Sequence, residues 1–322
     1  MRTKNRKSDC AVVITGSTRG LGFTLAEEFL GHGCRVTVSG RTPESVQAAL
    51  ERLRSHGQRV QGRVCDVTDP VRVLGLWDEA VGYWGRVDIW INNAGIPQEY
   101  VPAWELEPEA IARLISTNLL GTICGSRTAL RGMIAQGGGA IYNLEGWGSN
   151  GARRNGLTVY GTSKSAIRYF TRGLADEAAG TLVLVGTLSP GMMLTDFLTR
   201  PMQRMAEGEE RRMRRVVNIL GDHPQTVARF LVPRILANRR HRAHFAWLSG
   251  ARAMGRFLTA ARIRESQKES RFRMLISTAS RIVPGSTCTV SIFSNERRRL
   301  FAVWPSICRP WQTAARWCPE RP

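Results

Sequence analysis

Short apolar runs alternate along the chain with longer segments in which apolar residues recur at helical spacing. The runs expected to form strands cover residues 10–15, 35–39, 60–64, 87–91, 140–144 and 182–188. Segments 23–30, 43–56, 70–84 and 108–135 have the length and periodicity of helices. Short β-branched runs are typical of strands buried on both faces, so the alternation predicts an α/β fold around a parallel sheet.

A glycine-rich turn joins the first predicted strand to the first predicted helix. It reads Thr15, Gly16, Ser17, Thr18, Arg19, Gly20, Leu21, Gly22. Glycines permit a tight turn and a close approach of the backbone, and a helix N-terminus favours negative charge. In this strand-turn-helix context the turn predicts a binding site for the pyrophosphate of a dinucleotide.

The ends of the next two predicted strands suggest which dinucleotide is bound. The second strand ends at Arg41, where no acidic residue is present to hold a ribose 2′-hydroxyl. Arg41 and Arg19 together suit a 2′-phosphate, which favours NADP(H) over NAD(H); the alternative is two solvated arginines. Asp66, at the end of the third strand, is placed to accept a hydrogen bond from an adenine amino group.

Tyr160 and Lys164 lie four residues apart, which puts them on one face of a helix. A nearby cation lowers the pKa of an acid by roughly 1 to 3 units, so the pair is expected to form a proton donor for carbonyl chemistry. Of the 46 basic residues only four are lysine, and Lys164 is the one lysine between Lys7 and Lys268. Its retention among so many arginines indicates a task for an ammonium that a guanidinium cannot perform.

Composition narrows the remaining classes. The chain has 322 residues, 43% of them hydrophobic, and a formal net charge of +20. Such a charge suits nucleic-acid binding, but no nucleic-acid-binding motif accompanies it, so we expect no such partner. Seven cysteines without metal-ligand or disulfide-framework spacing, and no signal-peptide pattern, predict a cytoplasmic protein without a metal site.

Taken together, these motifs resemble those of the short-chain dehydrogenase/reductase family. The similarity covers residues 9–250 and includes the turn Thr15 to Gly22, the sequence Asn92 to Gly95, Asn118, the Tyr160 and Lys164 pair, and Pro190-Gly191 with Thr195. It implies a single doubly wound, Rossmann-type parallel sheet with helices on both faces. It also implies cofactor contacts from Thr15, Gly16, Ser17, Thr18, Arg19, Gly20, Leu21, Gly22, Arg41, Asp66, Val67, Asn93, Ala94, Gly95, Tyr160, Lys164, Pro190, Gly191 and Thr195.

The resemblance also implies catalytic roles for Tyr160 as proton donor, Lys164 as its partner and ribose ligand, and Asn118 as holder of a water. The family's serine normally lies thirteen residues before the tyrosine, where this chain has Trp147. Ser149 is the candidate that supplies the missing hydroxyl. The alternative is that Glu145 or a backbone amide polarises the carbonyl.

Within the family, several strings are similar to the chlorophyll(ide) b reductases, among them residues 143–149, 157–164, 189–196 and 224–234. This similarity implies reduction of the C7 formyl group of chlorophyll(ide) b to hydroxymethyl with NADPH. The alternatives are reduction of another carbonyl, such as a 3-oxoacyl thioester, steroid or quinone, or a non-catalytic NADPH-binding subunit. Side chains expected to line the substrate pocket are Trp104, Trp147, Met192, Met193 and Phe197.

The C-terminal third departs from the α/β alternation. Residues 199–221 are charged and methionine-rich, and we expect a mobile lid there. Residues 251–268 form a basic amphipathic helix, which either lies on an anionic membrane surface or packs on this or another subunit. Residues 1–8 are a basic extension and 269–322 a poorly ordered tail. Family members usually pair through the helices that hold Asn118 and Tyr160, which implies a homo-oligomer.

Overall fold

The computed structural model describes residues 9–202, 205 and 207–260. The chain divides into two compact units, Met1–Ser249 and Gly250–Pro322. Within the second unit, residues 250–260 are helical, where the basic amphipathic helix was predicted. The predicted extension at 1–8 and the tail at 269–322 lie outside the described residues.

The first unit is built on a seven-stranded sheet in the order β3-β2-β1-β4-β5-β6-β7. All neighbouring strands pair in parallel. Its strands are β1 (Ala11–Ile14), β2 (Arg35–Gly40), β3 (Val60–Val64), β4 (Ile89–Asn92), β5 (Gly139–Leu144), β6 (Val183–Ser189) and β7 (His244–Ala246). The order reverses direction between β1 and β4, which is the switch point where open α/β sheets bind ligands.

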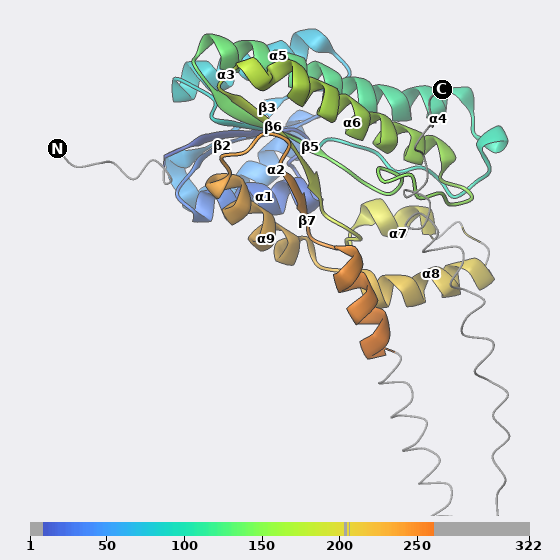
Figure 1. Ribbon diagram of the computed structural model, residues 1–322. Helices are drawn as coiled ribbons and strands as arrows, with labels where there is room; N and C mark the ends of the chain where they lie inside the picture. The colour runs from blue at the N-terminus through green and yellow to red at the C-terminus, as the bar shows by residue number, and fades with distance from the viewer. Residues whose placement is uncertain (1–8, 203–204, 206, 261–322) are drawn as a thin grey trace, which may run out of the picture. The chain divides into compact units, whose positions relative to one another are not determined.

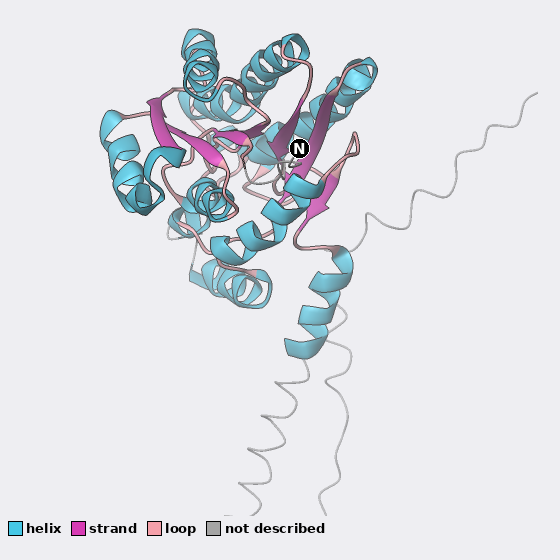
Figure 2. Cartoon of the chain, turned by 90° about the vertical axis from the view of Figure 1, so that its left-hand side faces the viewer, coloured by secondary structure: helices cyan, strands magenta, loops and turns pink. Residues whose placement is uncertain are grey.

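Helices cover both faces of this sheet (Figures 1 and 2). They are α1 (Gly20–Gly31), α2 (Pro43–Leu53), α3 (Pro70–Trp84), α4 (Pro108–Ile115), α5 (Gly121–Ala135), α6 (Thr158–Glu177), α7 (Asp196–Met202), α8 (Glu207–Leu220) and α9 (Pro224–Ala237). One apolar core joins the sheet to α1, α2 and α9, and a second joins the opposite face to α3 and α5. The predicted doubly wound parallel sheet is therefore confirmed.

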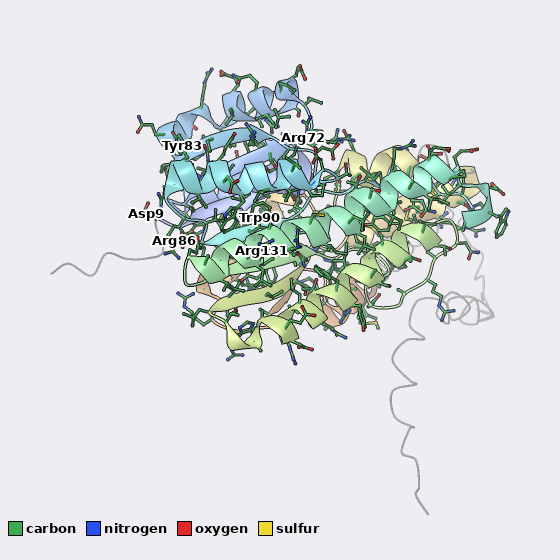
Figure 3. The ribbon with its side chains drawn as sticks, turned by 90° about the horizontal axis from the view of Figure 1, so that it is seen from above. Asp9, Arg72, Tyr83, Arg86, Trp90 and Arg131 are labelled. Atoms are coloured by element: carbon green, nitrogen blue, oxygen red, sulfur yellow. The ribbon has the colours of Figure 1, made fainter. Side chains whose placement is uncertain are left out.

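Local sequence explains where several of these helices begin and end. The Asp69 carboxylate accepts from the backbone N–H of Val71 at 2.9 Å, and Pro70 occupies the first helical position of α3. The helix ends at Gly85, whose φ of 80° is the left-handed conformation that favours glycine. Outward-facing residues such as Arg72 and Arg131 are charged, whereas Trp90 of β4 is fully buried (Figure 3).

A buried ladder of polar side chains ties the central strands to the helices on one face. The Trp90 indole Nε1 donates to Asn92 Oδ1 at 2.8 Å, and Asn92 Nδ2 donates to Asn143 Oδ1 at 2.8 Å. Asn143 in turn donates to Thr171 of α6 at 2.9 Å, and Ser126 of α5 hydrogen-bonds to both asparagines. Every member finds a partner, so the ladder fixes β4, β5, α5 and α6 relative to one another.

The structure differs from the sequence prediction in one place that bears on the site. The helix predicted over 108–135 is interrupted by a π turn over Ser116–Leu120, which carries the buried Asn118. The described part of residues 199–221 is largely helical, in α7 and α8, and the mobile lid expected there stays a prediction. Among the described residues, no helix is long and apolar enough to span a membrane.

Candidate active site

Thr15 fastens the glycine turn to the loop that follows β4. Its Oγ1 accepts hydrogen bonds from the backbone N–H groups of Asn93 at 3.0 Å and Ala94 at 3.1 Å. The Asn93 side chain returns the contact, because its Nδ2 donates to the carbonyls of Thr15 and Gly16, each at 2.9 Å. Two segments about eighty residues apart, the glycine turn and the Asn93–Gly95 loop, are thus hydrogen-bonded into one surface, which we call the floor of the site.

Glycine is required in this floor because the two segments touch. A Cβ on Gly16 would lie 2.8 Å from the Ala94 Cα, and the φ of Gly16 is +61°. A Cβ on Gly22 would lie 2.4 Å from Asn93 Nδ2. The glycine spacing that predicted a phosphate loop is therefore also the spacing that allows the Asn93 loop to pack against it.

The N-terminus of α1 is suited to an anionic group. Arg19 occupies its N-cap position and makes no side-chain cap hydrogen bond, and the first turn carries no acidic residue. Gly20 has a φ of +56°, and a Cβ there would meet only Thr195 Cγ2, at 4.0 Å. A cofactor pyrophosphate fits this arrangement, because the first N–H groups of a helix attract negative charge and the glycine leaves room. Arg19 and Arg41 are both exposed.

The other predicted cofactor residues surround this floor. Asp66 already uses Oδ1 to accept from the Thr68 backbone and hydroxyl, at 2.9 and 2.8 Å. Val67 is buried against Gly121, whose added Cβ would lie 2.7 Å from it. Pro190 is buried, and Gly191 (φ +74°) packs against Leu248. Their use by a cofactor stays a prediction.

Tyr160 and Lys164 lie on one face of α6, as predicted, and both are nearly inaccessible, at 9% and 5% exposure. The Lys164 Nζ donates to the Leu144 carbonyl at the end of β5, at 3.2 Å, and lies 5.8 Å from the centre of the Tyr160 ring. The lysine is thus fastened to the sheet beside the tyrosine rather than directly to its hydroxyl.

Burial dominates the electrostatics of the pair. It raises the pKa of the Tyr160 phenol above its ordinary value, and the nearby Tyr100 adds to the effect. Burial also lowers the pKa of Lys164 to about 8, although the Glu145 carboxylate acts in the opposite sense. The lowered Tyr160 pKa expected from the spacing is therefore not found, because desolvation of the phenol outweighs a cation that points to a backbone carbonyl.

Ser149 lies in the loop after β5, which folds back on itself. Its Oγ accepts from the Gly146 backbone N–H at 3.0 Å, and its own N–H donates to the Gly146 carbonyl at 3.1 Å. The Tyr160 hydroxyl reaches the same point, since a Cβ on Gly146 would lie 2.5 Å from it. The hydroxyls of Ser149 and Tyr160 therefore converge around Gly146, and the Ser149 proton is free to be donated elsewhere.

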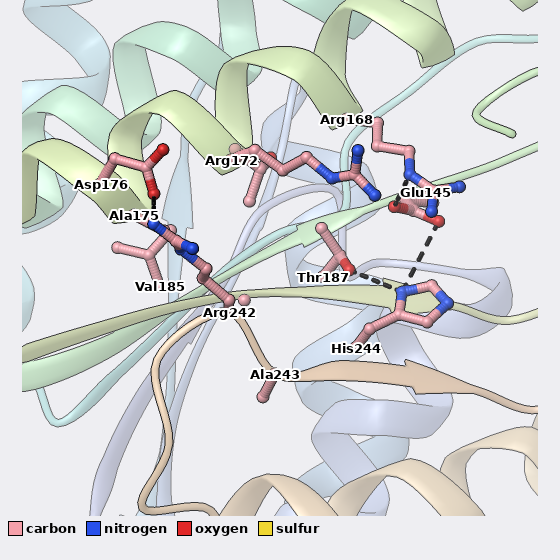
Figure 4. A pocket seen from close by; sticks show the side chains of 12 residues that line it. Glu145, Arg168, Arg172, Ala175, Asp176, Val185, Thr187, Arg242, Ala243 and His244 are labelled. Atoms are coloured by element: carbon pink, nitrogen blue, oxygen red, sulfur yellow. Dashed lines mark hydrogen bonds and ion pairs between the residues drawn. The ribbon is translucent and has the colours of Figure 1, made fainter. Parts of the chain in front are cut away.

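The alternatives to Ser149 occupy different places. Trp147, at the position usual for the family serine, is 41% exposed. The Glu145 carboxylate is buried and lies 3.8 Å from both Arg168 Nε and His244 Nδ1. It lines a pocket of about 420 Å³ between α6, β6 and β7 (Figure 4). These contacts commit Glu145 to that pocket, which favours Ser149 as the carbonyl-binding hydroxyl.

Asn118 braces the π turn against the segment that follows β4. Its Oδ1 accepts from the Ile96 N–H at 2.8 Å, and its Nδ2 donates to the Ile96 carbonyl at 3.1 Å. A Cβ on Gly95 would lie 3.2 Å from Asn118 Oδ1, so the turn packs tightly there. These contacts give Asn118 a positioning role, and the implied water-holding role stays a prediction.

The predicted substrate-facing side chains do not all share one environment. The ring of Phe197 meets that of Tyr160 edge-on, with centroids 6.0 Å apart. Met192 packs with Tyr100 against the buried Met202, Met213 and Val217, a group we call the lid cluster. Met193 packs against the main core beside α1 and α9 instead, and Trp104 is 85% exposed.

Sequence reasoning missed Gln98, which anchors the start of α6. Its Oε1 accepts from the Tyr160 backbone N–H at 2.7 Å, and its Nε2 donates to the Gly156 carbonyl at 2.9 Å. The residue is 4% exposed although it carries two polar groups. Nothing local marks it, because both partners lie some sixty residues later in the chain.

Comparison with known proteins agrees with this geometry. A family model described as short chain dehydrogenase matches residues 10–205. A probable chlorophyll(ide) b reductase NYC1, chloroplastic, of Oryza sativa subsp. japonica is 39% identical over 242 residues, which cover 70% of this chain and 47% of that protein. The chlorophyll(ide) b reductase NOL, chloroplastic, of the same organism is 36% identical over 259 residues, covering 77% of this chain and 74% of that protein. The chain thus spans about half the length of the first relative.

Solved structures show the same fold. An actinorhodin polyketide ketoreductase with NADPH is 26% identical with a TM-score of 0.66, covering 74% of this chain and 97% of that one. A gluconate 5-dehydrogenase of Burkholderia cenocepacia in complex with NADP and tartrate is 26% identical with a TM-score of 0.65, covering 76% and 95%. With its parallel sheet, its glycine turn and its buried tyrosine and lysine, this chain belongs to the short-chain dehydrogenase family.

Proposed function

We propose that the protein reduces a carbonyl group to an alcohol with NADPH, and that its substrate is the C7 formyl group of chlorophyll(ide) b. The observation that carries the reaction class is the convergence of the Tyr160 and Ser149 hydroxyls at Gly146, beside a glycine turn suited to a dinucleotide. The substrate is supported by the relatives named chlorophyll(ide) b reductase, which are up to 39% identical.

Tyr160 is the proton donor in this proposal. Its raised pKa keeps the phenol protonated at neutral pH, which is the form that a donor to a developing alkoxide requires. The charge left on the phenolate oxygen is stabilised by the Lys164 ammonium on the same helix face. Ser149 donates a hydrogen bond from its hydroxyl to the carbonyl oxygen and so orients the substrate.

The cofactor would be held by the floor described above. NADPH supplies the hydride when it is bound. The first turn of α1 would hold its pyrophosphate, and Arg19 and Arg41 its 2′-phosphate. Lys164 would bind the nicotinamide ribose, and Phe197 with the lid cluster would shield the carbonyl from water.

The test is single-turnover oxidation of NADPH with chlorophyllide b and a panel of other carbonyls, including a 3-oxoacyl thioester, a steroid ketone and a quinone. Formation of the 7-hydroxymethyl pigment, lost in Tyr160→Phe, supports both reaction and substrate. Turnover of another panel member alone keeps the reaction and rejects the pigment. NADPH binding without any turnover rejects the enzyme and favours a non-catalytic subunit, whose motivating feature is Trp147 at the usual serine position.

A further inference from the structure

Three polar contacts from within little more than one turn of α6 join that helix to the end of β5 and to the loop that carries Ser149. Lys164 Nζ donates to the Leu144 carbonyl at 3.2 Å, and Ser165 Oγ donates to the Gly148 carbonyl at 2.6 Å. Arg168 Nη1 donates to the Ser149 carbonyl at 3.4 Å. One helix face therefore holds both ends of the loop, and Arg168 holds the end at which the candidate hydroxyl sits.

Arg168 makes a second contact with the same loop. Its Nε lies 3.8 Å from Glu145 Oε1 (Figure 4). One guanidinium therefore contacts both the first residue of the loop and Ser149. The Glu145 side chain is 3% exposed, and its other oxygen lies 3.8 Å from His244 Nδ1 of β7. His244 is in turn hydrogen-bonded to Thr187 of β6 at 2.8 Å.

We propose that Arg168 is a positioning residue of the active site, which holds the Glu145–Ser149 loop against α6 and offsets the negative charge of Glu145 behind Lys164. The inference rests on the proposed function of Tyr160, Lys164 and Ser149. A guanidinium suits the task because its rigid planar fork holds two separated contacts in a fixed geometry, whereas the donors of an ammonium all lie on one nitrogen at the end of a flexible side chain.

The charges around this point define what the offset does. Two groups face the Lys164 ammonium: Glu145, which directly follows β5, and Tyr160 of the same helix, α6. Glu145 faces Arg168 and Arg172 from α6 and His244 from β7. The Glu145 carboxylate favours the protonated form of Lys164. The balance between the charges of Glu145 and Arg168 therefore adjusts the pKa of Lys164.

Direct titration of Lys164 by NMR tests the proposal. The whole chain has only four lysines, so labelling lysine at the ε-carbon gives a spectrum in which Lys164→Arg identifies the signal. We expect Glu145→Gln to lower the Lys164 midpoint and Arg168→Met to raise it, because each removes one side of the balance. The double variant is expected to lie between the two single variants, since the two charges act on Lys164 in opposite directions.

Arg172→Met is the matched control. Arg172 lines the same pocket one turn further along α6, and no contact joins it to the loop in the described part of the chain. Its variant should move the Lys164 midpoint less than Arg168→Met does, because Arg168, and not Arg172, forms an ion pair with Glu145 among the described residues. An Arg168→Met midpoint equal to that of the unaltered protein would overturn the charge role, whether or not the protein reduces any carbonyl.

Kinetics test the positioning role on whichever carbonyl the unaltered protein reduces. We expect Arg168→Met to lower kcat about tenfold at unchanged KM for NADPH, because small misplacements of catalytic groups are costly. Arg168→Lys should keep the Lys164 midpoint but recover little kcat, which separates charge from geometry. A kcat within about twofold of the unaltered protein rejects the positioning role.

Absence of turnover in the unaltered protein rejects the proposed function instead. The loop is then followed by hydrogen exchange of the Gly146 and Ser149 amides, which should exchange faster in Arg168→Met and not in Arg172→Met.

Discussion

The Lys164 ammonium lies 5.8 Å from the centre of the Tyr160 ring and is hydrogen-bonded to the last residue of β5 rather than to the phenol. The pair is thus fixed to the sheet through the lysine. Both groups are held in a site where burial favours their neutral forms, and we expect this to govern the pH dependence of the activity.

Replacing Tyr160 by phenylalanine should abolish turnover while leaving NADPH binding nearly intact, because only the proton donor is removed. Tyr169→Phe on the exposed side of the same helix is the control and should be silent. Steady-state rates and fluorescence titration of NADPH check both. Residual activity above about a tenth would reject Tyr160 as the acid.

Lys164→Met should stabilise the folded protein at neutral pH while abolishing activity. The folded Lys164 has a pKa of about 8 against an ordinary 10.5, so its burial costs on the order of 3 kcal/mol below pH 8. The sign follows from proton binding: the unfolded chain keeps this proton to higher pH, so the cost shrinks as the pH rises from 8 toward 10.5. Melting curves at several pH values measure it, and an equal Tm difference at pH 7 and pH 10 would contradict the assignment.

The activity itself should fall as the pH rises through about 8, since the Lys164 ammonium loses its proton there. The slope is read from kcat/KM for NADPH, which reports the groups of the free enzyme. A profile that is flat up to pH 10 would mean that the ammonium is not required.

Ser149→Ala should lower kcat by about 10²-fold, the usual effect of losing one donor to a developing oxyanion. Ser149→Thr retains the hydroxyl and should retain most of the rate. Introducing Trp147→Ser into the Ser149→Ala protein tests the position usual for the family. Full recovery there would show that the loop tolerates either position and that Ser149 is not uniquely placed.

Gly146→Ala should remove activity because its methyl group would lie 2.5 Å from the Tyr160 hydroxyl. Gly173→Ala, inside α6 but with open space around it, should stabilise the helix by roughly 0.5 to 1 kcal/mol. Comparing kcat and Tm for the two variants separates loss of the site from loss of the fold.

Arg41→Ala should raise the KM for NADPH about tenfold and leave that for NADH unchanged, because only the 2′-phosphate is affected. Arg131→Ala on the outer face of α5 is the control for lost surface charge (Figure 3). Equal effects on both cofactors would place Arg41 outside the phosphate site.

The elements that the sequence predicts well are those defined locally. β3 and α3 have the predicted bounds, because Asp69, Pro70 and Gly85 mark a helix start and stop within a few residues. The three residues of β7 give no readable pattern, since a strand this short is defined by its pairing with β6. The π turn at Asn118 is equally hidden, because the helical periodicity continues through it.

The site was predictable in its motif residues and not in their supports. Tyr160, Lys164 and the glycine turn stand at recognisable spacings. Gln98 and Arg168 carry no such signal, because each acts on partners brought to it by folding. The raised pKa of Tyr160 was missed for the same reason: the spacing revealed the cation but not the depth of burial.

Different interactions hold the candidate catalytic residues and the lid cluster. Tyr160, Lys164 and Ser149 rest on a sheet and helices locked by the Asn92–Asn143–Thr171 ladder, in which each hydrogen bond depends on the next. The lid cluster is held by methionines, whose unbranched side chains repack readily around altered shapes. If the proposed function holds, exchanging residues of α7 and α8 is expected to change which carbonyl is accepted while Tyr160, Lys164 and Ser149 stay in place, and attempts to redirect the specificity should begin there.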